Sequence, residues 1–180
     1  LFTPLLLLFT MNAGHNHSNC IDAYQICNLG SYHFPTLEGY GDQENLEITN
    51  SELAETNSMW LQFTARSSGE LEFVILPDNP EDDIDFVLYN GSSCDEKRPL
   101  RIMTSGDIVG EANYECIGQT GLQRISSDIE ESDGCYDLND NFLRPQYLEA
   151  GQSYYLLVNN FNSARGVTIL FAGDAGLELD

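Results

Sequence analysis

Basic residues are scarce in this sequence. Its 180 residues include 7 Lys and Arg against 29 Asp and Glu, so the formal net charge is −22. A chain with this charge repels nucleic acid and anionic membrane surfaces, so we expect neither as a partner. Beyond the first residues, no apolar run is long enough to span a bilayer, so we expect no membrane insertion of the mature domain.

Catalytic motifs are also missing. There is no G-x-S-x-G, no H-E-x-x-H and no glycine-rich phosphate loop, and carboxylate pairs are too common for a glycosidase pair to stand out. The three histidines form a poor transition-metal signal, because His15 and His17 have no third ligand near them and His33 is isolated. We therefore expect a protein that is not an enzyme.

Helical periodicity is rare, whereas short β-rich runs separated by Gly, Asn, Asp and Pro recur along the chain. The pattern predicts an all-β fold, an antiparallel β-sandwich of the jelly-roll kind. In "SMWLQFTARSSGELEFVILP" two strands alternate around a Ser-Ser-Gly turn, and "QSYYLLVNNF" with "RGVTILFAG" predicts an antiparallel pair joined by "NSARG". "NCIDAYQIC" predicts one helical turn.

The chain divides into three parts. Residues 1–14 have the apolar segment and small residues of a secretory signal, although a first strand is the alternative. Residues 15–177 are expected to form a single β-sandwich domain, and residues 178–180 to lead toward a further module. An exported chain of this kind is expected outside the cell or at its surface.

Five cysteines in an exported chain predict disulfides. Cys20 and Cys27 are close enough in sequence to tie down the N-terminus. Cys94, Cys116 and Cys135 then supply one further bridge and one odd thiol, and spacing alone leaves the pairing open.

An acidic cluster precedes the strand "DIDFVLYNG" and contains Asp82, Asp83 and Asp85. These carboxylates are either turn residues that accept backbone hydrogen bonds or oxygen ligands of Ca²⁺. Asp85 lies inside the strand, where burial of an uncompensated carboxylate is costly. Asn159 and Asn160 end an apolar strand and would complete the calcium site if the two strands are neighbours.

A long acidic insertion follows the strand that contains "LRIMTSG". Its residues could fold around a second cation, or the loop could simply be solvated. The candidate ligands are Asp128, Asp133, Asp137 and Asp140, with Glu131 and Asn139.

The chain resembles a β-sandwich domain of secreted surface proteins of Bacteroidota, exported by type IX secretion or associated with gliding motility. The resemblance rests on the segment from "ETNSMWLQF" to "LYNGSSC" and on "CIGQTGL", "GCYDLNDNFLRP", "GQSYYLLVNNFNSARG" and "ILFAG". The domain is similar to pre-peptidase C-terminal and CUB sandwiches. That similarity implies calcium at Asp83 and Asp85, with Asn159 and Asn160.

The same resemblance bears on the cysteines. Relatives have a cysteine where this chain has Ile102, which implies that Cys94 is a free thiol and that Cys116 pairs with Cys135. A bridge between Cys94 and Cys116 is the open alternative.

These observations predict a non-catalytic cell-surface or filament module for adhesion or assembly, stabilised by calcium. Its partners would be other surface-protein modules or further copies of itself. The alternative is a carbohydrate-binding module, with glycans as partners. Its aromatic platform would come from Trp60, Tyr89, Tyr114, Tyr136, Tyr154 and Tyr155.

Overall fold

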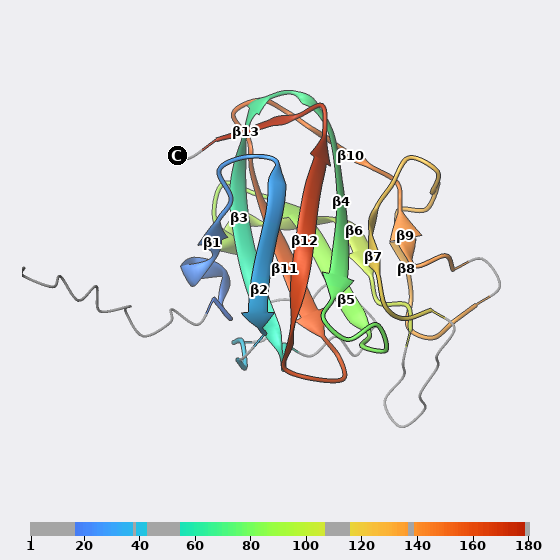
Figure 1. The fold of residues 1–180 in the computed structure, drawn as a ribbon. Helices are drawn as coiled ribbons and strands as arrows, with labels where there is room; N and C mark the ends of the chain where they lie inside the picture. The colour runs from blue at the N-terminus through green and yellow to red at the C-terminus, as the bar shows by residue number, and fades with distance from the viewer. Residues whose placement is uncertain (1–16, 38, 43–54, 107–115, 137–138, 179–180) are drawn as a thin grey trace, which may run out of the picture.

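The computed structural model describes residues 17–37, 39–42, 55–106, 116–136 and 139–178 (Figure 1). These residues form strands and two short 3-10 helices, η1 (Cys20–Asp22) and η2 (Cys94–Glu96), and they contain no α-helix. No helix in these ranges is long and apolar enough to cross a membrane. The strands are β1 (Tyr24–Gln25), β2 (Gly30–Thr36), β3 (Ser58–Ser67), β4 (Gly69–Pro77), β5 (Ile84–Asn90), β6 (Arg98–Met103), β7 (Thr120–Leu122), β8 (Glu130–Glu131), β9 (Phe142–Leu143), β10 (Gln146–Leu148), β11 (Ser153–Asn160), β12 (Arg165–Gly173) and β13 (Gly176–Glu178).

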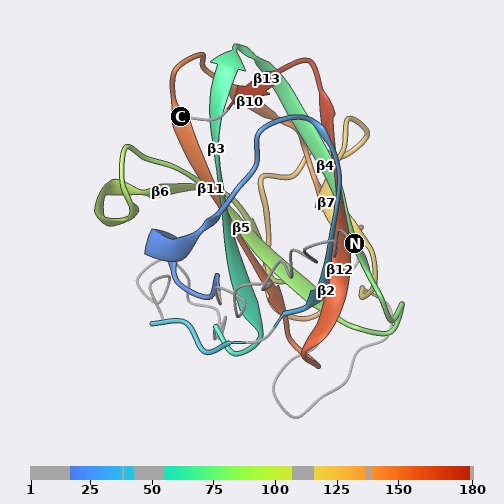
Figure 2. The same cartoon turned by 60° about the vertical axis from the view of Figure 1, so that its left-hand side comes forward.

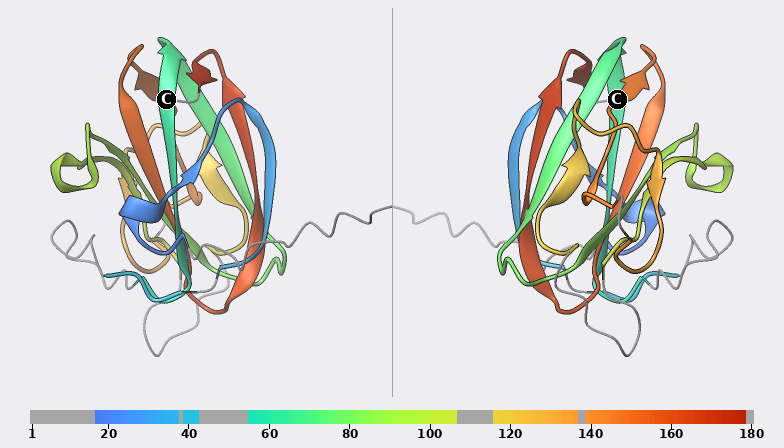
Figure 3. Two further views of the ribbon diagram at one scale, coloured as in Figure 1. Left: turned by 90° about the vertical axis from the view of Figure 1, so that its left-hand side faces the viewer. Right: turned by 90° about the vertical axis from the view of Figure 1, so that its right-hand side faces the viewer.

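Two sheets pack face to face as a sandwich, which confirms the predicted all-β class (Figure 3). The seven-stranded sheet has the order β1-β3-β11-β5-β6-β8, with β13 also paired to β3. The six-stranded sheet has the order β2-β12-β4-β7-β9, with β10 also paired to β4. All long neighbouring strands are antiparallel, whereas β1 with β3, β6 with β8 and β7 with β9 are short parallel pairs.

The predicted pairing of "QSYYLLVNNF" with "RGVTILFAG" is wrong. Strand β11 pairs with β3 and β5, whereas β12 lies in the other sheet between β2 and β4. The "NSARG" connection therefore crosses from one sheet to the other. A short polar connection shows that the chain reverses, but it does not show whether the two strands bond to each other or pack across a core.

The main core lies between the two sheets. Every second residue of β3 and β4 points into it, so the predicted apolar faces of both strands are buried. Phe73 of β4 packs edge-on against Phe86 of β5, with ring centroids 5.2 Å apart. Complete burial of a side chain of this size contributes about 1.5–3 kcal/mol.

A second apolar cluster covers the outer face of the seven-stranded sheet. It contains Cys20, Trp60, Val87, Tyr89, Tyr155 and Leu157. The N-terminal segment runs beside β3 (Figure 2), where β1 extends the sheet at its edge and η1 places Cys20 in the outer cluster. The three central strands of the sheet are therefore buried on both faces.

A disulfide between Cys20 and Cys94 holds that segment in place, so the expected Cys20–Cys27 bridge and the free Cys94 are both wrong. Strand β1 extends between Cys20 and Cys27 and separates them, whereas η1 and η2 bring Cys20 and Cys94 together at a Cα distance of 5.8 Å. Cys27 is the free thiol. The second disulfide joins Cys116 to Cys135, as the resemblance implied.

Candidate functional site

The predicted acidic site lies where β5 begins and β11 ends. The two strands are antiparallel neighbours, with Asp85 opposite Asn159 and Ile84 opposite Asn160. The structure thus brings together the two sets of residues that the sequence placed there. Asp82, Asp83, Asp85, Asn159 and Asn160 are all buried, with exposed fractions of 4% or less.

Asp82 is the best-satisfied carboxylate of the cluster. Its Oδ2 accepts hydrogen bonds from Asn160 Nδ2 at 2.9 Å and from Ser163 Oγ at 2.7 Å. Its Oδ1 accepts from Asn79 Nδ2 at 2.8 Å and from Arg165 Nη1 at 3.2 Å. Four donors around one carboxylate compensate its burial without a metal ion.

The electrostatics of Asp82 agree with this geometry. Burial by itself would raise the pKa of Asp82, but the hydrogen bonds from Asn160, Asn79 and Ser163 and the charge of Arg165 outweigh it and lower that pKa. The ionised carboxylate therefore ties the turn before β5 to the turn after β11. Its role in the structure is that of a clamp between two turns.

Asp83 is held by its backbone. Its N–H donates to Asn162 Oδ1, and its carbonyl accepts from the Phe161 N–H at 2.9 Å. Its carboxylate lies against Gly106, where an added Cβ would collide with both carboxylate oxygens. The φ of Gly106 is +130°, a conformation that favours glycine.

The asparagine at the end of β11 has a mixed role. Asn159 Oδ1 accepts from the Asn57 N–H at 3.3 Å, while Asn159 Nδ2 has no hydrogen-bond partner among the described residues. Ser58, opposite Asn159 on β3, also has a buried hydroxyl without a partner in that part of the chain. A buried polar group of this kind costs about 1–3 kcal/mol.

Clusters of metal-binding side chains are absent from the described residues. No three His, Cys, Asp or Glu side chains in those ranges converge as a metal site. Calcium also binds amide and backbone carbonyl oxygens. A calcium site can therefore consist of two carboxylates and neutral oxygens, without three clustered acidic side chains. Asp82 already accepts hydrogen bonds from four donors, with which a cation at that carboxylate would have to compete.

The second acidic loop is organised around Glu131, which is 4% exposed. Its carboxylate accepts from the backbone N–H groups of Asp140 at 3.0 Å and Asn141 at 3.2 Å. Burial raises the pKa of Glu131, despite these hydrogen bonds. Asp140 in turn accepts from Ser126 Oγ at 2.9 Å.

The other ligands predicted for this loop do not form a metal site with Glu131 and Asp140 in the described part of the chain. Asp128 and Asp133 are partly exposed, and Asn139 Nδ2 donates to the Gly134 carbonyl at 3.3 Å. Asp137 lies outside the described residues. The contacts of Glu131 and Asp140 fold the loop by hydrogen bonds to its own backbone.

The histidines have ordinary contacts where they are described. His17 Nδ1 lies 2.5 Å from the Asp22 carbonyl, and His33 Nε2 lies 3.3 Å from the Asp78 carboxylate. His15 lies outside the described residues.

The predicted aromatic platform does not form. Trp60, Tyr89, Tyr154 and Tyr155 are buried, because they lie on strands whose two faces are both covered. Of the six candidates, Tyr136 is exposed at 65% and Tyr114 lies outside the described residues. Tyr147, which the sequence analysis did not single out, is exposed at 58%.

The sequence analysis also missed the donors around Asp82. Asn79 and Ser163 belong to polar turns that the sequence analysis took as simple connections, and Arg165 is the first residue of β12. The signal that could have found them is the concentration of Asn, Ser and Arg in "NNFNSAR", next to the strand that carries Asn159.

Comparison with known proteins does not add a relative to this picture. Neither the models of known protein families nor the sequences of curated proteins match this chain.

Proposed function

We propose that this chain is a non-catalytic extracellular module of a cell-surface or filament protein and works in adhesion or assembly. The observation that carries the proposal is the pair of disulfides, one over the outer face of a sheet and one in the acidic insertion. Disulfides form and persist in oxidising compartments outside the cytosol. The resemblance to secreted surface domains of Bacteroidota agrees with this location.

The buried acidic groups support a structural role. Asp82 and Glu131 both direct their oxygens at donors of neighbouring turns, which fixes those turns in place. Carboxylates bound in this way reinforce a rigid scaffold. A rigid sandwich with fixed loops suits a module that presents a binding surface.

Calcium is the second part of the proposal, at Asp83 and Asp85, the two carboxylates that the resemblance implies, with neutral oxygens near them. Both residues are buried at a strand end in a chain of net charge −22, where a cation would offset repulsion. At 100 times its dissociation constant, a bound ion would add about 2.7 kcal/mol to the free energy of unfolding.

Thermal unfolding with millimolar Ca²⁺ and with chelator tests this site. The wild type is expected to melt at a lower temperature with chelator, whereas Asp85→Asn should respond little. Asp82→Asn is the matched control, because it should melt lower in both conditions and keep its calcium response. Identical wild-type curves in the two conditions would refute the calcium site.

Sedimentation velocity of the oxidised chain tests the assembly role over a range of protein concentrations. Species larger than a monomer that grow with concentration would support self-association. A monomer under all conditions that also binds no sugar on a glycan array would contradict both the assembly and the adhesion forms of the proposal.

Carbohydrate binding is the second candidate function. The observation that favours it is the exposed Tyr147 ring beside a pocket that contains arginines.

A further inference from the structure

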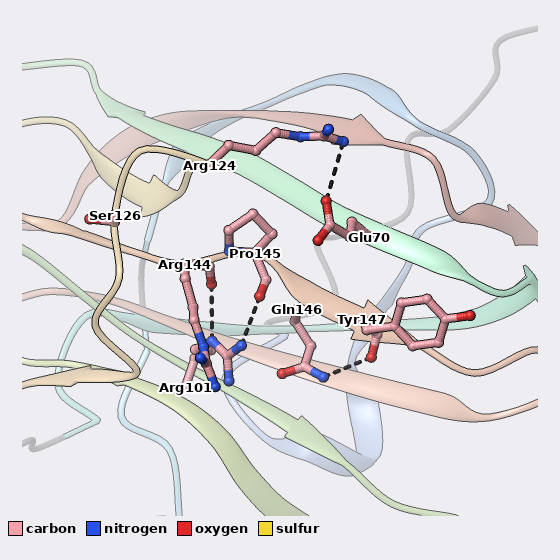
Figure 4. A pocket seen from close by; sticks show the side chains of 8 residues that line it. All are labelled: Glu70, Arg101, Arg124, Ser126, Arg144, Pro145, Gln146 and Tyr147. Atoms are coloured by element: carbon pink, nitrogen blue, oxygen red, sulfur yellow. Dashed lines mark hydrogen bonds and ion pairs between the residues drawn. The ribbon is translucent and has the colours of Figure 1, made fainter.

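A pocket of about 610 Å³ lies beside β10 and the segment that leads into it (Figure 4). Its lining includes Arg101, Arg124 and Arg144, which are three of the 7 basic residues of the chain. The rest of the chain is strongly acidic. The Glu70 carboxylate also lines the pocket, so its attraction for anions depends on which of the three guanidinium groups is paired with carboxylates.

Arg124 is already neutralised. Its Nε lies 2.7 Å from Glu72 Oε1, and its Nη2 lies 3.3 Å from Glu70 Oε2 and 3.2 Å from Asp174 Oδ2. The hydrogen bond that Arg124 donates to Glu72, followed by the charges of these carboxylates, raises the pKa of Arg124. Arg124 thus lines the pocket, but its positive charge is already paired with carboxylates of the protein.

Arg101 is different, because its side-chain hydrogen bonds within the described part of the chain all go to backbone carbonyls. Its Nε donates to the Arg144 carbonyl at 3.0 Å, its Nη1 to the Leu100 carbonyl at 2.6 Å and its Nη2 to the Pro145 carbonyl at 2.7 Å. Arg101 is 8% exposed. Neutral carbonyls orient this guanidinium group but leave its charge uncompensated.

Arg144 places a second positive charge next to it. Burial and then the charge of Arg144 lower the pKa of Arg101 to about 10, so Arg101 stays cationic at neutral pH. Neither residue forms an ion pair with any carboxylate in the described ranges. Arg144 is exposed, so an anion from solvent can reach it.

An aromatic ring and an amide complete the pocket. Gln146 lies between the two guanidinium groups and the Tyr147 ring in Figure 4. Gln146 Nε2 donates to the Tyr147 carbonyl at 2.7 Å, which leaves its amide oxygen as an acceptor. The exposed ring of Tyr147 supplies a rigid, partly apolar surface beside the two cations.

We propose that this pocket binds a hexuronate residue of an acidic polysaccharide, with the sugar carboxylate on Arg144 above Arg101 and the sugar ring against Tyr147. A guanidinium group pairs with a carboxylate through two parallel hydrogen bonds. The sugar ring brings an apolar face for the tyrosine and hydroxyl donors for the Gln146 oxygen. This inference rests on the proposed adhesive function and names a ligand class for it.

Calorimetric titration of the oxidised chain with trigalacturonate, and with its neutral methyl ester, tests the pocket. Trigalacturonate should bind saturably and the ester at least tenfold more weakly, because esterification removes the charge that Arg144 recognises. Arg144→Gln should lower the affinity about 10- to 100-fold, the effect expected for a charge-assisted hydrogen bond. Tyr147→Ala should lower it about three- to tenfold.

Arg66→Gln is the matched control, because Arg66 is an exposed arginine of β3 outside the pocket and its loss changes the net charge equally. Three results would overturn the proposal: no saturable binding of trigalacturonate, equal effects of the two arginine substitutions, or equal affinity for acid and ester. Inorganic sulfate bound as tightly as trigalacturonate, with no effect of Tyr147→Ala, would overturn the sugar assignment.

Absence of trigalacturonate binding at this pocket can be distinguished from failure of the proposed assembly and adhesion function. Self-association and the calcium response do not depend on Arg144, so Arg144→Gln should leave both unchanged. A chain that assembles or responds to calcium but ignores trigalacturonate would remove the pocket assignment alone.

Discussion

Removal of the Cys20–Cys94 disulfide should destabilise the protein more than removal of Cys116–Cys135. The first bridge spans 74 residues and the second spans 19. Loop-closure entropy then assigns about 4.4 kcal/mol to the first and about 3.2 kcal/mol to the second at 25 °C. The two loops do not overlap in sequence, so the losses should add.

Urea unfolding of Cys20→Ala/Cys94→Ala and of Cys116→Ala/Cys135→Ala measures both quantities. The single tryptophan, Trp60, is fully buried in the cluster that contains Cys20 and reports the transition. Loss of the first bridge is expected to cost about 4.4 kcal/mol. That is a large part of the free energy of unfolding of a typical domain, about 5–15 kcal/mol.

Cys27→Ala is the matched control and should change the free energy of unfolding by less than about 1 kcal/mol, because Cys27 is the free thiol. Peptide mapping of the unreduced protein gives an independent check. Cleavage before Asp22 separates Cys20 from Cys27, so a peptide that contains Cys20 shows directly which cysteine is bound to it. A Cys20–Cys27 link, or equal stability of Cys20→Ala/Cys94→Ala and Cys27→Ala, would refute the reasoning.

Three further substitutions test the buried acidic groups by urea unfolding. Asp82→Ala should cost about 1–3 kcal/mol, because it removes an acceptor of the buried Asn160 amide and of the partly buried Asn79 amide, whereas Asp78→Ala, whose exposed carboxylate faces His33, should cost less than about 1 kcal/mol. Gly106→Ala should cost at least about 1–3 kcal/mol, since φ is +130° and the new Cβ meets the Asp83 carboxylate. Glu131→Gln should remove the fall in wild-type stability that accompanies a pH rise above 4.5, because the folded state raises the pKa of Glu131 and so favours its protonated form.

Each of these predictions has a contradicting outcome. The folded state lowers the pKa of Asp82, so the stability it contributes is present above pH 3.8 and is lost as pH falls through the lowered value. A penalty for Asp82→Ala that is as large at very low pH as at neutral pH would contradict the clamp. Gly151 has a positive φ but open space around it, so equal costs of Gly106→Ala and Gly151→Ala would exclude a collision. If Glu131→Gln shows the same pH dependence of stability as the wild type, the buried Glu131 carboxyl group is not the source of that dependence.

Much of the local structure could be predicted from the sequence. Alternation of apolar and polar residues has a period of two in a strand, and this local signal correctly indicated β3, β4, β5, β11 and β12. The sequence left open whether the strands that carry Asp85 and Asn159 are neighbours, and their register shows that they are. Composition and cysteine content predicted a disulfide-bonded all-β domain.

The partners of these elements were decided by the tertiary structure. Whether β11 bonds to β12 depends on which distant strands occupy its two edges, and those strands are β3 and β5. The same holds for Cys20, whose partner is 74 residues away. The donors around Asp82 and the guanidinium pair of Arg101 and Arg144 likewise come from separate segments. The sequence by itself determined the long strands and the residues of β3 and β4 that face the core, because those properties depend on local alternation. Only the folded chain decided which residues meet and that the outer aromatic residues Trp60, Tyr89 and Tyr155 are buried, because contacts between distant segments depend on how the two sheets and the N-terminal segment pack.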